Sequence, residues 1–326
     1  MTKVYLTIDT EYEFGFAAQN GIDGPAREQN FARSIQCRAP GGDVGIAYQM
    51  DVLERHGLKA VFFVDPMPAL VWGTRAIARV VEPILARGHD VQLHVHTEWL
   101  ALAGSANPLG GKTGRNIKDF TRGEQEVLLD YAREALMAAG APRPVAFRAG
   151  NYGANDDTLR ALARLGFAYS SNHTPGIAGS ECDIDLGPEH RRPLRRLGVT
   201  EIPIGCIQVP GGLRHAQLTA LSCRELRGAV NHACRHGIDS FTIVSHSFEL
   251  MCRGRRRINR IVRRRFEQFC AVLEAMPGAE TATYADGRVV ARTAPRQPRQ
   301  VLPPNPVRSG VRIVEQAVAN ALYGAG

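Results

Sequence analysis

Short β-prone segments alternate with amphipathic helical segments along most of this chain, and this alternation restricts the fold more than any other feature. A strand followed by a helix, repeated about seven times, predicts parallel strands joined by helical crossovers. The predicted strands lie at residues 4–8, 59–64, 90–96, 145–148, 167–170, 201–204 and 241–245. The predicted helices lie at residues 44–56, 74–87, 122–139, 156–165, 222–236 and 258–275. We therefore expect an α/β fold with a parallel sheet or barrel.

Two segments interrupt this alternation. Residues 12–42 are rich in glycine and proline and predict a long loop after the first strand, with Asp43 as N-cap of the next helix. Beyond Arg292 the chain is again proline-rich and predicts an extended tail, with a short amphipathic helix over residues 311–322. The expected organisation is one barrel over residues 1–291 and a C-terminal tail over residues 292–326.

Composition excludes several classes of protein. The chain is 44% apolar and 22% charged, which is an ordinary globular composition and excludes collagen-like and disordered chains. No segment approaches the roughly 18 uncharged apolar residues of a membrane helix. The seven cysteines are scattered and never spaced as CxxC, which favours a reducing compartment over a disulfide framework. Because the start of the sequence shows no readable export signal, we expect a cytoplasmic protein.

Positive charge is concentrated in one segment. The net charge is +8, and eight arginines fall between Arg253 and Arg265. Such a cluster is typical of a solvated helix face, and it also suits phosphate groups of a substrate, a lipid or a nucleic acid. No zinc-finger spacing or aromatic RNA-binding signature accompanies it, so we expect no nucleic-acid partner.

Polar side chains gather where four of the predicted strands end. They are Asp9 and Glu11 after the first strand, His94, His96 and Glu98 at the third, Arg148 to Tyr152 at the fourth, and His246 at the last. Parallel α/β folds place their sites at the carboxyl ends of the strands, so we expect these residues to lie close together. Mixed histidine and carboxylate ligands suit Zn²⁺ or another divalent transition metal.

These motifs, taken in order, resemble the polysaccharide deacetylase family, metal-dependent carbohydrate esterases with a distorted seven-stranded (β/α)7 barrel of parallel strands. The resemblance extends from about Val4 to Met276. It implies that the barrel over residues 1–291 is a catalytic domain. It implies that Asp9, in the segment Leu-Thr-Ile-Asp-Thr-Glu, is the catalytic base and that Glu11 is a metal ligand.

The same resemblance implies roles for the later motifs. His94 matches the first histidine of the family's His-x-x-x-His motif; the second position holds Glu98, and His96 is a nearby substitute, so both stay open as the third ligand. Arg148 matches the arginine that orients the base in Arg-x-Pro, with Gly150 in place of proline. The family also implies that His246 is the proton donor and that backbone amides near Asn151 and Tyr152 help to bind the substrate by holding the oxyanion. Trp99 is a further candidate for lining the substrate cleft, with packing in the core or at the rim as the alternative.

The expected activity follows from this resemblance. It implies one divalent metal, zinc first and Mn, Co, Fe or Ni as alternatives, and a hydrolase that removes an acetyl group from an N-acetylated or O-acetylated sugar or glycan precursor. A hydrolase of other C–N bonds, such as cyclic amides or imides, is one alternative. A non-catalytic carbohydrate-binding relative is the other.

Overall fold

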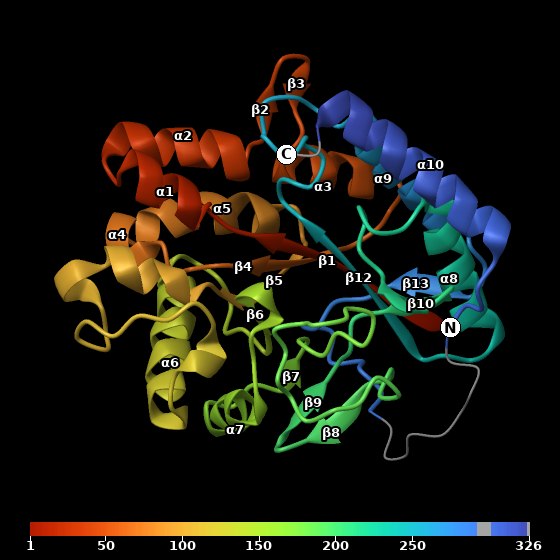
Figure 1. Cartoon of the computed structure of the whole chain (residues 1–326). Coiled ribbons are helices and arrows are strands. Elements are labelled where there is room, and N and C mark those ends of the chain that lie inside the picture. The colour runs from red at the N-terminus through yellow and green to blue at the C-terminus, as the bar shows by residue number, and fades with distance from the viewer. Residues whose placement is uncertain (292–300, 325–326) are drawn as a thin grey trace.

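A computed structural model describes residues 1–291 and 301–324 and shows a curled, mostly parallel sheet surrounded by helices (Figure 1). The sheet order is β12-β1-β4-β5-β6-β7-β9-β8, and β13 pairs with the start of β1. Its strands are β1 (Thr2–Thr10), β4 (Val61–Val64), β5 (Asp90–Val95), β6 (Ala146–Ala149), β7 (Tyr169–Ser170), β8 (Leu194–Arg196), β9 (Val199–Glu201), β12 (Ser240–His246) and β13 (Ala279–Thr281). Only β8 runs antiparallel to its neighbour, and the expected distorted parallel barrel is confirmed.

The predicted helices all form, and capping residues fix where several of them begin. They are α3 (Ile46–Arg55), α5 (Thr74–Ala86), α6 (Arg122–Ala138), α7 (Asp156–Arg164), α8 (Cys223–Arg235) and α9 (Arg260–Glu274). Thr121 and Glu124 form a reciprocal capping box before α6. The Asn155 side chain accepts from the Thr158 amide at the start of α7. A further short helix is α4 (Ala69–Trp72), and a small hairpin consists of β10 (Cys206–Val209) and β11 (Gly212–His215).

The prediction of a long loop over residues 12–42 is wrong. This stretch contains α1 (Phe14–Asn20), α2 (Gly24–Ser34) and a hairpin of β2 (Arg38–Ala39) and β3 (Gly42–Asp43). Pro25 stands in the first turn of α2, where a missing amide hydrogen costs nothing, and Asp23 caps that helix through the Ala26 amide at 2.8 Å. Asp43 belongs to the hairpin, and Gly45 is the N-cap of α3.

The helix predicted over residues 311–322 is longer than expected. It is α10 (Pro306–Tyr323), which begins earlier because Asn305 caps it and proline occupies its first position. Figure 1 shows α10 lying across the outside of α8 and α9. The proline-rich segment 292–300 of the predicted tail lies outside the described residues. None of the helices that the structure describes is long and apolar enough to cross a membrane.

Alternation along the strands divides apolar from polar side chains. On β1, residues 4, 6 and 8 face the helices and join the main core, while Tyr5 joins a small inner cluster with Phe63 and Tyr284. The Tyr5 and Tyr284 rings stack at 4.9 Å between centroids. Because successive side chains of a strand point to opposite faces, Asp9 and His94 share the inner face with this cluster. The inner face is therefore apolar at one end of the barrel and polar at the carboxyl ends of its strands.

Candidate active site

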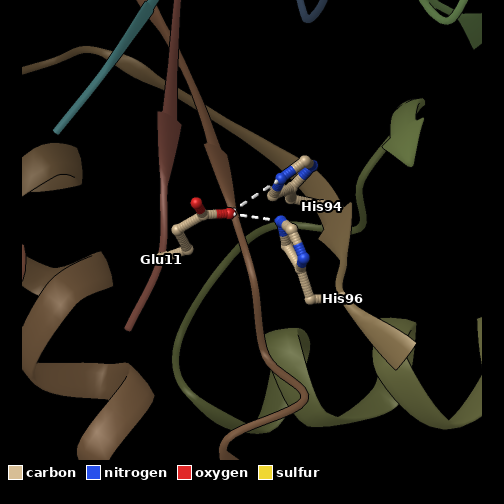
Figure 2. A group of neighbouring side chains, drawn as sticks. All are labelled: Glu11, His94 and His96. Carbon is tan, nitrogen blue, oxygen red and sulfur yellow. Dashed lines mark hydrogen bonds and ion pairs between the residues drawn. The ribbon is translucent and has the colours of Figure 1, made fainter. Parts of the chain in front are cut away.

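Three side chains at the carboxyl ends of β1 and β5 converge on one point. The ligand atoms of Glu11, His94 and His96 all lie within 4.8 Å of one another, the one such group of three among the described residues (Figure 2). One Glu11 carboxylate oxygen lies 3.2 Å from His94 Nε2 and 2.5 Å from His96 Nε2. Burial opposes ionisation of Glu11, but the two imidazoles outweigh it and hold its pKa well below the ordinary value.

The far nitrogen of each imidazole is held by a separate acceptor. His94 Nδ1 donates to the Arg148 carbonyl oxygen at 2.8 Å, and His96 Nδ1 donates to Glu98 at 2.9 Å. These bonds fix the ring orientations and direct both Nε2 atoms toward Glu11. Histidine ligands of metals are oriented in this way by a carbonyl or carboxylate on the second nitrogen. Two imidazoles and one carboxylate form a donor set found in catalytic zinc sites, so these residues fit a divalent metal.

The structure places Glu98 outside this group of three. Its carboxylate contacts His96 Nδ1, on the side of the ring away from Glu11, and accepts from Asn151 Nδ2 at 3.5 Å. His96 also explains the glycine at position 150. A Cβ atom at Gly150 would lie 2.6 Å from His96 Nδ1 and 2.7 Å from its Cε1, closer than real Cβ contacts come. The imidazole therefore occupies the space in which a proline side chain would stand.

Asp9 and Arg148 form a buried ion pair beside this group. Arg148 Nη1 lies 2.6 Å from Asp9 Oδ1, and both side chains are at most 5% exposed. Arg148 is held further by Thr7 Oγ1 at 2.9 Å and by the carbonyl and hydroxyl of Ser171 at 3.1 Å each. Its guanidinium lies over the Phe63 ring, 4.3 Å from the centroid. This network fixes the direction of the Asp9 carboxylate, as the sequence motif predicts for an orienting arginine.

His246 ends β12 directly beside Asp9, its partner in the β1–β12 ladder. Its Nδ1 lies 3.1 Å from Glu249, whose other oxygen accepts from Gln217 Nε2 at 2.9 Å and from Thr219. Burial lowers the pKa of His246, but Glu249, Asp9 and Glu11 outweigh burial and raise that pKa to about 9. His246 is therefore protonated near neutral pH, and the carboxylate of Glu249, three residues later in the chain, holds the proton in place.

The backbone is strained directly after β6, where the chain leaves the sheet beside the site. Asn151 and Tyr152 both adopt left-handed conformations, with φ of 56° and 57°. Two adjacent residues in this region cost on the order of 1–3 kcal/mol each, and such strain concentrates at functional sites. The Asn151 side chain is held by Asn116 at 3.2 Å. Trp99, by contrast, is fully buried against Phe14 and the Trp72 ring, so the structure places this predicted substrate contact in the core.

A cavity of about 610 Å³ opens beside His246, within the size range of small-molecule sites. One wall comes from the loop after β12, including Phe248 and Arg255, and the opposite wall from the end of α10, including Ala319 and Tyr323. The Arg255 guanidinium lies over the Phe248 ring at 3.7 Å from the centroid and 3.1 Å from Glu13. Sequence reasoning did not place the C-terminal helix at the site.

Asp65 is the buried acid that the sequence analysis missed. It follows β4 directly and is 1% exposed; Oδ1 accepts from the amides of Met67 at 3.0 Å and His96 at 3.4 Å. Among the residues that the structure describes, its Oδ2 has no hydrogen-bond partner. Burial raises the pKa of Asp65 to about 7, against the opposing effect of the two neighbouring histidines. The rule that polar residues at strand ends mark the site would have found it.

Three solved structures align with most of this chain. A candidate polysaccharide deacetylase from Mycobacterium smegmatis aligns with 91% of this chain and 94% of its own length, at a TM-score of 0.57 and 19% identity. A 4-α-glucanotransferase from Thermococcus litoralis aligns with 89% of this chain and 41% of its own, at a TM-score of 0.51 and 11% identity. A family 4 carbohydrate esterase from Streptomyces lividans, in complex with acetate, covers 89% and 97%, at a TM-score of 0.44 and 11% identity.

Comparison by sequence gives no such neighbours: no family model matches the chain, and no curated protein matches it. At sequence identities of 11–19%, the similarity to these structures shows the fold alone. The chain has a polysaccharide-deacetylase-like fold, which confirms at the level of architecture the resemblance seen in the motifs. Because one fold hosts different reactions, the activity has to be argued from the site.

Proposed function

We propose that this chain is a metal-dependent deacetylase that hydrolyses the acetamido group of an N-acetylated sugar. The observation that carries the proposal is the meeting of three units at one end of the barrel. They are the group Glu11, His94 and His96, the ion pair of Asp9 and Arg148, and the hydrogen-bonded pair of His246 and Glu249. Amide hydrolysis needs these three kinds of unit: a metal site, a base and an acid.

Glu11, His94 and His96 would hold the metal. A divalent metal there supplies Lewis-acid chemistry, because it lowers the pKa of water to about 7 and polarises an acyl oxygen. Glu98 acts on this site indirectly, by fixing the direction of the His96 ring. In this proposal His96, rather than Glu98, is the third ligand.

Asp9 accepts the proton of the attacking water, and Arg148 holds the carboxylate in a fixed direction. The water oxygen forms a bond to the acetyl carbon, and the C–N bond then breaks. His246 donates its proton to the departing amine nitrogen, and Glu249 stabilises the imidazolium until that transfer. General acid or base catalysis of this kind contributes roughly 10²–10⁴-fold each. The products are acetate and the free amino sugar, so atoms and protons balance.

The cavity beside His246 would hold the sugar. It adjoins the proton donor, and its lining combines amide and arginine side chains with the rings of Phe248 and Tyr323. Aromatic faces with a few polar groups suit a sugar ring, which has apolar faces and a hydroxyl edge. Three arginines of the 253–265 segment also line it, and two of them are paired with carboxylates, Arg255 with Glu13 and Arg265 with Glu315.

The proposal is tested by metal content and acetate release on the purified chain. We expect about one divalent metal per chain in the wild type, loss of metal in Glu11→Ala and His94→Ala, and full retention in the control His56→Ala. His56 is a surface histidine that pairs with Glu274, remote from the strand ends. The metal-loaded chain should release acetate from N-acetylated sugars, and Asp9→Asn should bind metal without releasing acetate.

Other outcomes decide against the proposal. Turnover of cyclic amides or imides, with none of acetylated sugars, would assign the site to a different C–N hydrolase. Sugar binding by a wild type that takes up no Zn²⁺, Mn²⁺ or Co²⁺ would make the chain a binding protein on this fold.

A further inference from the structure

The C-terminal helix α10 carries an exposed apolar stripe. Nine large apolar side chains remain exposed among the described residues, and five of them lie on α10, with exposures between 43% and 68%. They are Val307, Ile313, Val314, Val318 and Leu322. Positions 307, 314, 318 and 322 recur at spacings of seven and four, so they share one side of the helix. A contiguous exposed apolar surface marks an interaction site more often than an accident of packing.

Polar contacts of α10 with α8, with α9 and with the loop before α9 fix this orientation. Arg312 Nε donates to the buried Glu225 carboxylate of α8 at 3.2 Å. Glu315 accepts from Arg265 Nη2 of α9 at 2.7 Å, and the Leu322 carbonyl accepts from Arg257 at 3.1 Å. Turning the stripe inward would break these contacts and leave the buried Glu225 carboxylate without its Arg312 partner. The stripe is therefore a fixed feature of the folded surface.

Basic side chains stand beside the stripe. Arg260 and Arg264, both exposed on α9, line a groove of about 520 Å³ together with Val314 and Val318. Within the described part of the chain neither arginine has an acidic partner. The single acidic residue of α10, Glu315, forms an ion pair with Arg265. The surface therefore combines apolar side chains with uncompensated positive charge.

We propose that α10 and the adjoining arginines of α9 dock this chain on an anionic lipid surface. An interfacial helix inserts its apolar side chains at the boundary between headgroups and acyl chains, and neighbouring arginines bind the anionic headgroups. A second copy of this chain fits the surface less well. A symmetric contact through the stripe would bring Arg260 and Arg264 of both copies together with no acid between them.

The end of α10 is also one wall of the cavity beside His246, through Gln316, Ala319, Asn320 and Tyr323 on the side of the helix away from the stripe. The docking does not depend on the metal site or on catalysis, so each of the two proposals can be refuted without the other.

Cosedimentation with lipid vesicles tests the docking. We expect the metal-free wild type to bind vesicles of phosphatidylcholine with one third phosphatidylglycerol, to bind pure phosphatidylcholine far more weakly, and to be released by added salt. Val314→Asn with Val318→Asn should weaken binding at least tenfold, and Arg260→Gln or Arg264→Gln about fivefold each. The matched controls are Val127→Asn on α6 and Arg75→Gln on α5, which lie on other surfaces and should bind as the wild type does.

Three results would overturn the proposal. The first is a wild type that does not bind the anionic vesicles. The second is vesicle binding that remains unchanged in the stripe variant and in the arginine variants. The third is a wild-type dimer in sedimentation velocity that Val314→Asn with Val318→Asn converts to monomer, because the stripe would then be a contact between copies of this chain.

Discussion

Replacing Gly150 by alanine should damage the metal centre without touching any metal ligand. The added Cβ would lie 2.6 Å from His96 Nδ1, 2.7 Å from Cε1 and 2.8 Å from Cγ, where ordinary contact begins at 3.4 Å. The ring must therefore move by about 0.8 Å, several times the ~0.2 Å within which metal–ligand distances are held. That shift also strains the bond from His96 Nδ1 to Glu98. Losses of this kind weaken metal affinity 10–100-fold, or about 1.4–2.8 kcal/mol.

Competition with a chromogenic chelator measures this affinity directly. Gly123→Ala on α6 is the matched control, because a Cβ there meets nothing within 4 Å. Gly150→Ala added to His96→Ala should have no further effect, since the ring that it displaces is gone. Zinc affinity of a folded Gly150→Ala within twofold of the wild type would refute the placement of His96 over this glycine.

Three further perturbations test the units of the site. Glu98→Gln should weaken metal affinity 10–100-fold at unchanged fold, because the group that orients His96 loses its charge; an affinity equal to the wild type would make Glu98 a mere surface acid. Glu249→Gln removes the main support of the His246 proton, so the loss of activity on the basic side should move from about pH 9 down toward 6.5, and an unmoved pH–rate profile would contradict it. Arg148→Met leaves the Asp9 carboxylate buried without its partner and should lower the free energy of unfolding by about 3–5 kcal/mol in urea titrations; a loss below 1 kcal/mol would show that the pair is not buried in solution.

Strand ends were the part of the site that the sequence predicted best. Alternation of apolar and polar residues along β1 and β5 places Asp9 and His94 on the inner face, and parallel strands bring their carboxyl ends together. Both rules act within a strand and its immediate neighbours, so they are readable without the three-dimensional structure. The pairing of Asp9 with Arg148 crosses 139 positions, yet the same rules anticipate it because both side chains are at strand ends.

Features that depend on packing between distant segments were not predictable. The glycines and prolines of residues 12–42 indicated a loop, but Pro25 is harmless in a first turn and α2 forms on the barrel. The apolar pattern of α10 predicted a helix, but not its docking over α8 and α9 through Arg312 and Glu315. Trp99 was a candidate for the substrate cleft with core packing as the alternative, and the fold places it in the core against Phe14.

The two departures from the family motifs are explained by one geometric change. Read separately, a glutamate at position 98 and a glycine at 150 resemble the decay of a metal site. In the structure the second imidazole comes from His96, two residues earlier, and its ring stands over Gly150, where a proline would collide with it. Glu98, on the family's ligand position, instead holds the far nitrogen of that ring. A decaying site has no reason to lose the proline in the one place that the relocated ring requires, or to keep a carboxylate in hydrogen-bond reach of it. His96, Glu98 and Gly150 therefore fit one another in a single arrangement, which supports the proposed metal centre over a non-catalytic relative.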